Sequence, residues 1–253
     1  MIERVIRLGV IGLIVLIGAG CASTNEEDPT EGMAVAEIYE EASNLLKSGD
    51  YEGAILLYER LESRFPYGKY AERAQMEIAY AYYKDSEPES AIVAADRFIK
   101  LHPNHDNIDY MYYLRGLASY DLSESFMQSL FDVDPSQHDP KSARRAFEYF
   151  AQLLKKYPKS RYSKDALQRM TLIRNNLAQY EVHVAKYYMR RGAYLAAANR
   201  GKYVVSNYQR TPAVADALAI MADAYTKLGM ADLANDTKRV LEMNHPDHKS
   251  LKK

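Results

Sequence analysis

The chain has 253 residues, of which 47% are hydrophobic and 26% are charged, and this balance excludes a disordered or fibrous protein. Its 33 basic residues face 34 acidic ones, and a net charge of −1 argues against a general nucleic-acid binder, which usually has a basic excess. The single cysteine excludes an internal disulfide and a cysteine-rich metal site. Tyrosine dominates the aromatic residues (22 Tyr, 6 Phe, no Trp), which suits half-buried surfaces because the ring is apolar and the hydroxyl is wet.

The first 20 residues have the pattern of an export signal. Arg4 and Arg7 precede an uncharged run from Leu8 to Gly20. This run is shorter than the roughly 20 residues that a bilayer-spanning helix needs. We therefore interpret residues 1–20 as a signal peptide and exclude them from the fold.

Small residues at 18–20 stand directly before Cys21. The arrangement resembles a bacterial lipobox, although Gly18 stands where leucine is usual and Ile17 lies one step further back. The resemblance implies that Cys21 carries a diacylglycerol thioether and an N-acyl chain, the only prosthetic group we expect. With each methylene worth ~0.8 kcal/mol, several acyl chains would hold the protein at a membrane. The alternative is an ordinary cleaved signal followed by a cysteine that has no function.

Residues 21–32 form a polar, acidic stretch that contains Pro29 and Gly32, and we interpret it as a flexible tether. Its r.m.s. reach is roughly 20 Å, which would keep a folded domain near the membrane face. Ala22, rather than Asp, follows the cysteine. By resemblance to the usual lipoprotein sorting rule, this predicts the periplasmic face of the outer membrane, with attachment by the lipid alone.

Three residue columns recur five times along residues 33–246, with reference positions 37, 55, 51 and 37 residues apart. Before each reference position lie an alanine (12 residues back), an apolar side chain (5 back) and a ring (1 back). The reference positions are Pro66, Pro103, Pro158, Gln209 and Pro246. The alanines are Ala54, Ala91, Ala146, Ala197 and Ala234. The apolar residues are Leu61, Phe98, Leu153, Val204 and Leu241, and the rings are Phe65, His102, Tyr157, Tyr208 and His245.

This period resembles the tetratricopeptide repeat (TPR), two antiparallel helices per ~34 residues with small residues where they cross. The expected fold is an all-α solenoid of five helix pairs: repeats one to three in residues 33–160, repeats four and five in 161–246, and a tail in 247–253. Gly49, Gly192 and Gly229 stand where a helix end favours a left-handed residue. Pro88 suits the first turn of a helix.

The two long spacings predict extra structure. Residues 121–140 form an insertion, in which we expect a short helix around Ser123 to Phe131 followed by a loop. The first helix of repeat four is expected to extend from Ser163 to Arg191 and to brace the first three repeats against the last two.

Longer strings resemble one family more specifically, the BamD (competence lipoprotein ComL) family of outer-membrane lipoproteins. They are RFPYGKY (64–70), AYAYYK (79–84), DRFIKLHPNHDNIDYMYYLRGL (96–117), YPKSRYSKDALQR (157–169) and YEVHVAKYYMRRGAYLAAANR (180–200). The resemblance implies a protein without catalytic activity that belongs to the β-barrel assembly machinery. Its implied partners are the POTRA domain of BamA, BamC-like and BamE-like lipoproteins, and unfolded outer-membrane β-barrel proteins.

The resemblance further implies that the N-terminal repeats recognise a C-terminal strand of the client. In TPR geometry the first helix of each repeat lines the concave face, which here would be aromatic with a few cations. Rings would pack against client rings, and Lys or Arg would bind a terminal carboxylate. The expected groove residues are Tyr39, Lys47, Arg73, Met76, Tyr80, Tyr83, Lys84, Tyr110 and Tyr113, with Ser43 and Tyr120 beside them. The alternative is that the tyrosines fill gaps between helices.

For docking on BamA, the resemblance points to Arg200, with Arg190, Arg191 and Lys202 as neighbours. The alternative for Arg200 is a solvated helix residue that contributes little.

Two groups of polar residues suggest metal ligands, but we interpret the first as structural and the second as an adventitious metal site at most. His102, His105, Asp106 and Asp109 lie in a turn after a helix, where packing or capping is expected, and His245 and His248 stand near the C-terminus. A phosphate loop, a nucleophile elbow and a zinc-protease motif are all missing from the sequence, so no enzyme is expected. A TPR lipoprotein serving another envelope system, such as a pilotin or a regulator of peptidoglycan enzymes, remains an alternative.

Overall fold

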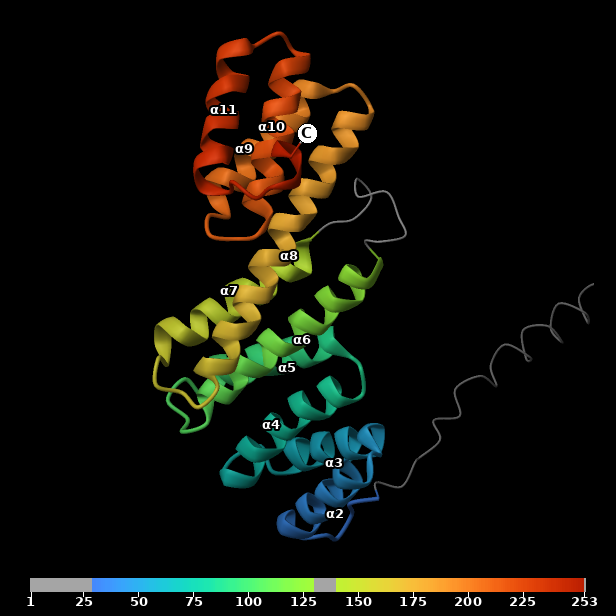
Figure 1. Ribbon diagram of the computed structural model, residues 1–253. Coiled ribbons are helices and arrows are strands. Elements are labelled where there is room, and N and C mark those ends of the chain that lie inside the picture. Colours follow the sequence, from blue (N-terminus) through green and yellow to red (C-terminus); the bar gives the residue numbers. More distant parts are fainter. Residues whose placement is uncertain (1–28, 130–139, 253) are drawn as a thin grey trace, which may run out of the picture. The chain divides into compact units, whose positions relative to one another are not determined.

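The computed structural model describes residues 29–129 and 140–252, except for the side chains of residues 123–129. Contacts divide the chain into residues 1–34 and Val35–Lys253. All helices described below lie in the second unit (Figure 1). The predicted signal peptide and Cys21 lie outside the described residues.

The second unit consists of five consecutive helix pairs, and the described residues contain no strand. Each helix contacts the next one in the chain, and the first helices of successive pairs also touch (α2 with α4, α4 with α6, α6 with α8, α8 with α10). The predicted all-α solenoid of TPR-like pairs is therefore confirmed. The pairs are α2 (Val35–Ser48) with α3 (Tyr51–Arg64), α4 (Lys69–Lys84) with α5 (Pro88–Leu101), α6 (Ile108–Ser129) with α7 (Lys141–Lys156), α8 (Ser163–Arg190) with α9 (Tyr194–Asn207), and α10 (Ala213–Lys227) with α11 (Ala231–Asn244).

The three sequence columns have a common structural explanation. The alanines lie on the second helix of each pair and are buried, which lets the two helix axes approach closely. The apolar residues five positions before the reference are buried as well, between 0 and 1% exposed. Each ring residue caps the second helix, and its backbone N–H donates to the carbonyl of the apolar residue at 2.8 Å in all five pairs. The columns thus encode helix crossing, core packing and helix termination.

In the four pairs whose inner turn the structure describes, that turn contains one residue with positive φ. Gly49, Gly192 and Gly229 have φ of 90°, 74° and 73°, as predicted from the helix-end pattern. Ser86 occupies the same place between α4 and α5, with φ of 63°. A positive φ is sterically unfavourable for serine because of its Cβ atom, which glycine lacks.

The prediction of a separate short helix at 123–131 is wrong, because α6 runs without a break to Ser129. The sequence contains no glycine or proline between Gly116 and Pro135, so nothing interrupts the helix. The rest of the predicted insertion loop, residues 130–139, lies outside the described residues.

The long first helix of repeat four is confirmed, since α8 spans 28 residues from Ser163 to Arg190. It contacts α6 and α7 of the third pair, α9 of its own pair and α10 of the fifth. One helix therefore connects the N-terminal three pairs with the C-terminal two. None of the described helices combines the length and apolarity that a membrane crossing requires.

Candidate functional site

The first helices of the pairs carry a group of half-buried tyrosines, which we call the tyrosine face: Tyr39 on α2, Tyr80 and Tyr83 on α4, Tyr110 and Tyr113 on α6, and Tyr162 at the start of α8. Most of these rings, together with Met76, pack on the edge of the largest core cluster, which extends from α4 to α8. They are neither free in solvent nor fully buried. They therefore help to hold the helices together and still offer partial ring surface.

On the α6–α8 side, aromatic contacts and hydrogen bonds fix the rings. Tyr162 stacks on Tyr113 with centroids 4.6 Å apart and an interplanar angle of 14°, and it lies 5.5 Å from Tyr110. The Tyr113 hydroxyl donates to Asp165 Oδ2 at 2.6 Å, and Arg169 Nε donates to the same oxygen at 2.7 Å. This part of the face is therefore rigid and preorganised.

The pKa values agree with this network. Burial, followed by the hydrogen bond to Asp165, raises the pKa of Tyr113 to about 12. Burial, followed by a hydrogen bond to Asp121, raises the pKa of Tyr83 to about 12. Burial alone would raise the pKa of Asp165, but its bonds from Tyr113 and Arg169 outweigh burial and lower it. The tyrosines therefore remain neutral donors while Asp165 is charged at neutral pH.

On the α2–α4 side, Tyr39 lies 5.6 Å from the buried ring of Tyr58 and 5.5 Å from Tyr70, centroid to centroid. Glu77 lies at intermediate exposure on α4. Its charge acts on Tyr39 and on Tyr110, which belong to the pairs on either side. The sequence interpretation missed Glu77, although its spacing from Arg73 and Tyr80 places it on the same stripe of the helix.

The three cations predicted for this surface, Lys47, Arg73 and Lys84, are all exposed. They stand on the same helices as the half-buried rings, so a bound segment could contact rings and cations together. The prediction that Tyr120 lies beside the groove is wrong. Tyr120 is 6% exposed, the Arg169 guanidinium lies 4.9 Å from its ring centre, and it belongs to the core. Tyr162, Asp165 and Arg169 were not predicted as part of this surface, because they belong to the next repeat.

In the C-terminal pairs, Arg200 has a partner that neither sequence interpretation foresaw. Its Nη1 donates to Glu181 Oε2 on α8 at 2.9 Å, and Arg144 of α7 lies 3.7 Å from the other oxygen of the same carboxylate. The Glu181 side chain is 1% exposed, whereas those of Arg200 and Arg144 are 44% and 47% exposed. Burial would lower the pKa of Arg200, but the bond to Glu181 outweighs burial and raises it. Arg200 thus neutralises a buried carboxylate and keeps part of its surface open.

Arg190 and Arg191, the other predicted docking residues, are exposed at the end of α8. Their guanidinium groups lie 5.9 and 5.3 Å from the centre of the Tyr187 ring. Lys202 is exposed on α9. None of these three residues has a buried charge to neutralise within the described part of the chain, so they differ from Arg200.

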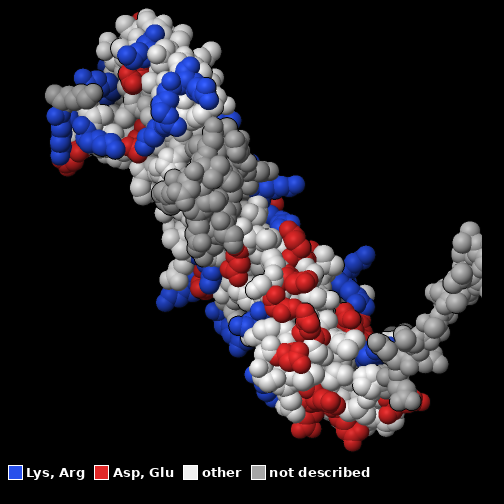
Figure 2. Space-filling model, turned by 90° about the vertical axis from the view of Figure 1, so that its right-hand side faces the viewer, with Lys and Arg blue, Asp and Glu red and all other residues white. Residues whose placement is uncertain are grey.

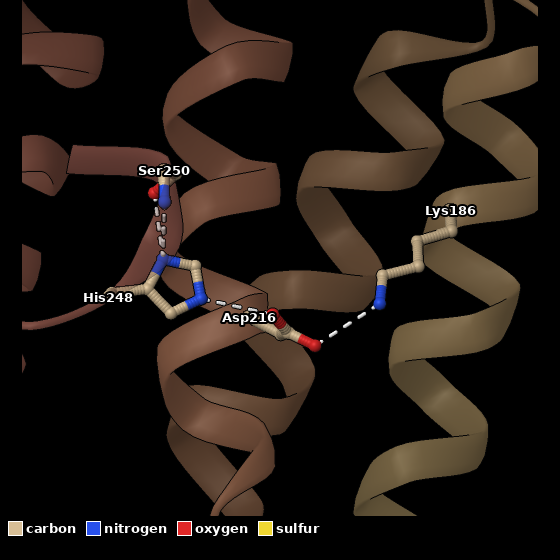
Figure 3. A network of polar contacts seen from close by, with 4 residues as sticks. All are labelled: Lys186, Asp216, His248 and Ser250. Atoms are coloured by element: carbon tan, nitrogen blue, oxygen red, sulfur yellow. Dashed lines mark hydrogen bonds and ion pairs between the residues drawn. The ribbon is translucent and has the colours of Figure 1, made fainter. Parts of the chain in front are cut away.

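A hollow of about 640 Å³ lies between α8, α10, α11 and the C-terminal tail, with Arg190 among its lining residues. Figure 3 shows how the tail is held there: His248 Nε2 lies 3.0 Å from Asp216 Oδ1, and Lys186 Nζ lies 3.1 Å from Asp216 Oδ2. Ser250 Oγ lies 2.8 Å from His248 Nδ1. Asp216 on α10 therefore connects α8 to the tail.

The histidines that suggested metal ligands have structural roles. His102 caps α5, packs 4.8 Å from the Phe98 ring and forms a 2.9 Å hydrogen bond with Gln75. The His105 ring lies edge-on to the same Phe98 ring, with centroids 5.1 Å apart. No group of three or more metal-binding side chains occurs among the described residues.

Charge is divided unevenly between the two parts of the chain. Residues 161–253 contain 16 Lys and Arg against 8 Asp and Glu, whereas residues 33–160 contain 15 against 21. On the face drawn in Figure 2, acidic side chains gather over the N-terminal helices and basic ones over the C-terminal helices. The near-zero total charge is therefore the sum of an acidic N-terminal part and a basic C-terminal part.

Comparisons with known proteins agree with these features. The model of a family described as outer membrane lipoprotein, YfiO, matches residues 31–241. A Neisseria meningitidis serogroup A protein named outer membrane protein assembly factor BamD is 45% identical over 232 residues, which cover 90% of this chain and 87% of the relative. Proteins of the same name from Xylella fastidiosa and Vibrio cholerae are 40% and 36% identical, covering 97% and 93% of this chain and 84% and 96% of their own. With a matching family model and such similarity along nearly the whole length, this chain belongs to the BamD family of outer-membrane lipoproteins.

Proposed function

We propose that this chain is a scaffold lipoprotein of outer-membrane β-barrel assembly. It would bind the POTRA region of a BamA-type barrel protein, recognise unfolded barrel precursors and help to deliver them for insertion. The observation that carries the proposal is the 45% identity, along 90% of the chain, to a protein named outer membrane protein assembly factor. BamC-like and BamE-like lipoproteins would be further partners. No catalytic step and no nucleic acid are involved.

In this proposal Cys21 is acylated and holds the protein at the periplasmic face of the outer membrane. The family description, outer membrane lipoprotein, supports this location. The polar stretch from residue 21 to 32 would then tether the helix pairs close to the membrane.

The tyrosine face would bind an extended client segment. Half-buried rings on successive first helices offer stacking surface at a low entropic cost, because their neighbours already restrain them. The exposed cations Lys47, Arg73 and Lys84 would bind a terminal carboxylate. Rigid rings with flexible cations suit a client class that shares aromatic character but varies in sequence.

The C-terminal pairs would dock on the POTRA region. The basic excess of residues 161–253 supports an acidic partner surface. Arg190 and Arg191 are exposed and would make direct contacts, whereas Arg200 would contribute through the part of its guanidinium that Glu181 leaves open.

Depletion in the source bacterium tests this function. We expect barrel proteins to disappear from the outer membrane while secreted and inner-membrane proteins persist. Expression of the unchanged chain should restore them, and a Cys21→Ala copy, which cannot be acylated, should not. Normal barrel levels after depletion would contradict the proposal.

A further inference from the structure

Glu77 differs from the other charged groups near the tyrosine face. It stands on α4 four residues after Arg73 and three before Tyr80, so the three share one stripe of the helix. It is at intermediate exposure, and no hydrogen bond or ion pair to it is found among the described residues. The charge of Lys47 on α2 acts on it.

The surroundings of Glu77 are mostly aromatic. After burial, its charge is the next cause that raises the pKa of Tyr39 and of Tyr58, and it also acts on Tyr110. The buried Tyr58 hydroxyl lies near Ser43 and Glu77 but makes no hydrogen bond of normal geometry in the described structure. Burial raises the pKa of Glu77 itself, and the charge of Lys47 opposes that shift. Glu77 thus stands on the α4 stripe that carries Tyr80, on a helix that contacts α2, α3 and α6.

Asp165, also on this surface, is an example of a carboxylate whose hydrogen-bond donors are present. One of its oxygens accepts hydrogen bonds from both Tyr113 and Arg169. A carboxylate can only accept hydrogen bonds, and one that loses water without gaining a donor is strongly destabilised. A segment that covered the tyrosine face would take water away from Glu77. A hydrogen-bond donor on the segment would replace that water, beside the charge of Lys47.

We infer that Glu77 is the acceptor which the tyrosine face presents to a hydrogen-bond donor of the bound client segment, and that it selects against a carboxylate at that place. This inference rests on the proposed function of the tyrosine face. The donor is either a backbone N–H of the extended segment or a Lys or Arg side chain. Two carboxylates in a partly desolvated site repel each other, so Glu77 acts as a specificity-determining residue.

The test uses a series of synthetic nine-residue peptides with alternating tyrosines and a free C-terminus. Each non-aromatic position is made Glu, Gln or Lys in turn, and affinity for the full mature chain is measured by titration. For the unchanged chain we expect one position at which Glu binds at least tenfold more weakly than Gln. In Glu77→Gln this penalty should fall below about twofold.

The control is Glu41→Gln, which removes an exposed carboxylate from α2 and should leave the penalty unchanged. At the sensitive position, tighter binding of the Lys peptide would identify a side-chain donor, and weaker binding after N-methylation would identify a backbone donor. An equal Glu penalty in the unchanged chain and in Glu77→Gln would overturn the inference while leaving the tyrosine face as a binding surface. If none of the peptides binds the unchanged chain, the proposed role of the face fails, and the inference fails with it.

Discussion

The Arg200 guanidinium of α9 lies 2.9 Å from the carboxylate of Glu181 on α8, a side chain that is only 1% exposed. The residue that the family resemblance assigns to partner docking therefore also neutralises a buried charge inside the fold. A charge reversal at Arg200 would place two carboxylates together in a buried site, so its effect on a partner could not be separated from its effect on stability.

Arg200→Ala should destabilise the protein. Removing one partner of a buried ion pair leaves an uncompensated charge, although Arg144 at 3.7 Å compensates in part, so we expect a loss of about 2 kcal/mol. Urea unfolding followed by circular dichroism measures it. The double variant Arg200→Ala, Glu181→Gln should recover more than half of the loss, and additive losses would contradict the assigned pairing.

Ser86→Gly should stabilise the protein by about 0.5–1 kcal/mol. Ser86 adopts a φ of 63° at the turn between α4 and α5, where the equivalent turns have glycine. The reverse change, Gly192→Ser, is the matched control and should cost a similar amount, since its φ is 74°. Equal urea midpoints for all three proteins would show that the backbone at these turns is not strained.

Gly116→Ala should destabilise the third pair. A Cβ at this position would lie 2.5 Å from Cε1 of Phe150, so α6 could not keep its distance from α7. Overpacking of this kind costs about 1–3 kcal/mol. A smaller side chain in Phe150→Leu should relieve the clash, so the double variant should be more stable than the sum of the single changes predicts. Simple additivity in urea unfolding would argue against the close approach.

Asp216→Asn should loosen the C-terminal pairs in a pH-dependent way. Burial would raise the pKa of Asp216, but hydrogen bonds from His248 and Lys186 outweigh it and hold the pKa below the ordinary 3.8. A carboxyl whose pKa is lowered by folding stabilises the protein above its unfolded pKa, and this contribution is lost as the pH falls through the folded value.

The unchanged chain should therefore be more stable than Asp216→Asn at pH 7, and the difference should shrink below pH 3.8. Urea unfolding across that range measures the difference. A difference that does not depend on pH would mean that Asp216 acts through packing alone.

The repeats could be predicted because each column residue has a local role. Ala54 and Leu61 are buried on α3 and Phe65 caps its end, and the same three roles recur in every pair. The continuous α6 was missed although the chain gives a signal for it, since the next helix breaker after Gly116 is Pro135.

The charged contacts of the surfaces could not be predicted in the same way. Glu181 and Arg200 are 19 residues apart on different helices, and their meeting depends on how α8 and α9 pack. The hydrogen bond between Tyr113 and Asp165 joins residues that are 52 positions apart and belong to neighbouring repeats. Helical periodicity identifies the residues that share a face, but the contacts between faces depend on tertiary packing.

The most direct test of the proposed role is purification of the tagged, acylated chain from bacterial envelopes in mild detergent, beside an Arg190→Glu, Arg191→Glu variant. These two arginines are exposed, so the change should leave the fold intact, which a thermal melt would check. We predict that a large barrel protein with POTRA domains accompanies the unchanged chain and is depleted in the variant. If no such barrel protein accompanies either form, the proposed role in barrel assembly is contradicted.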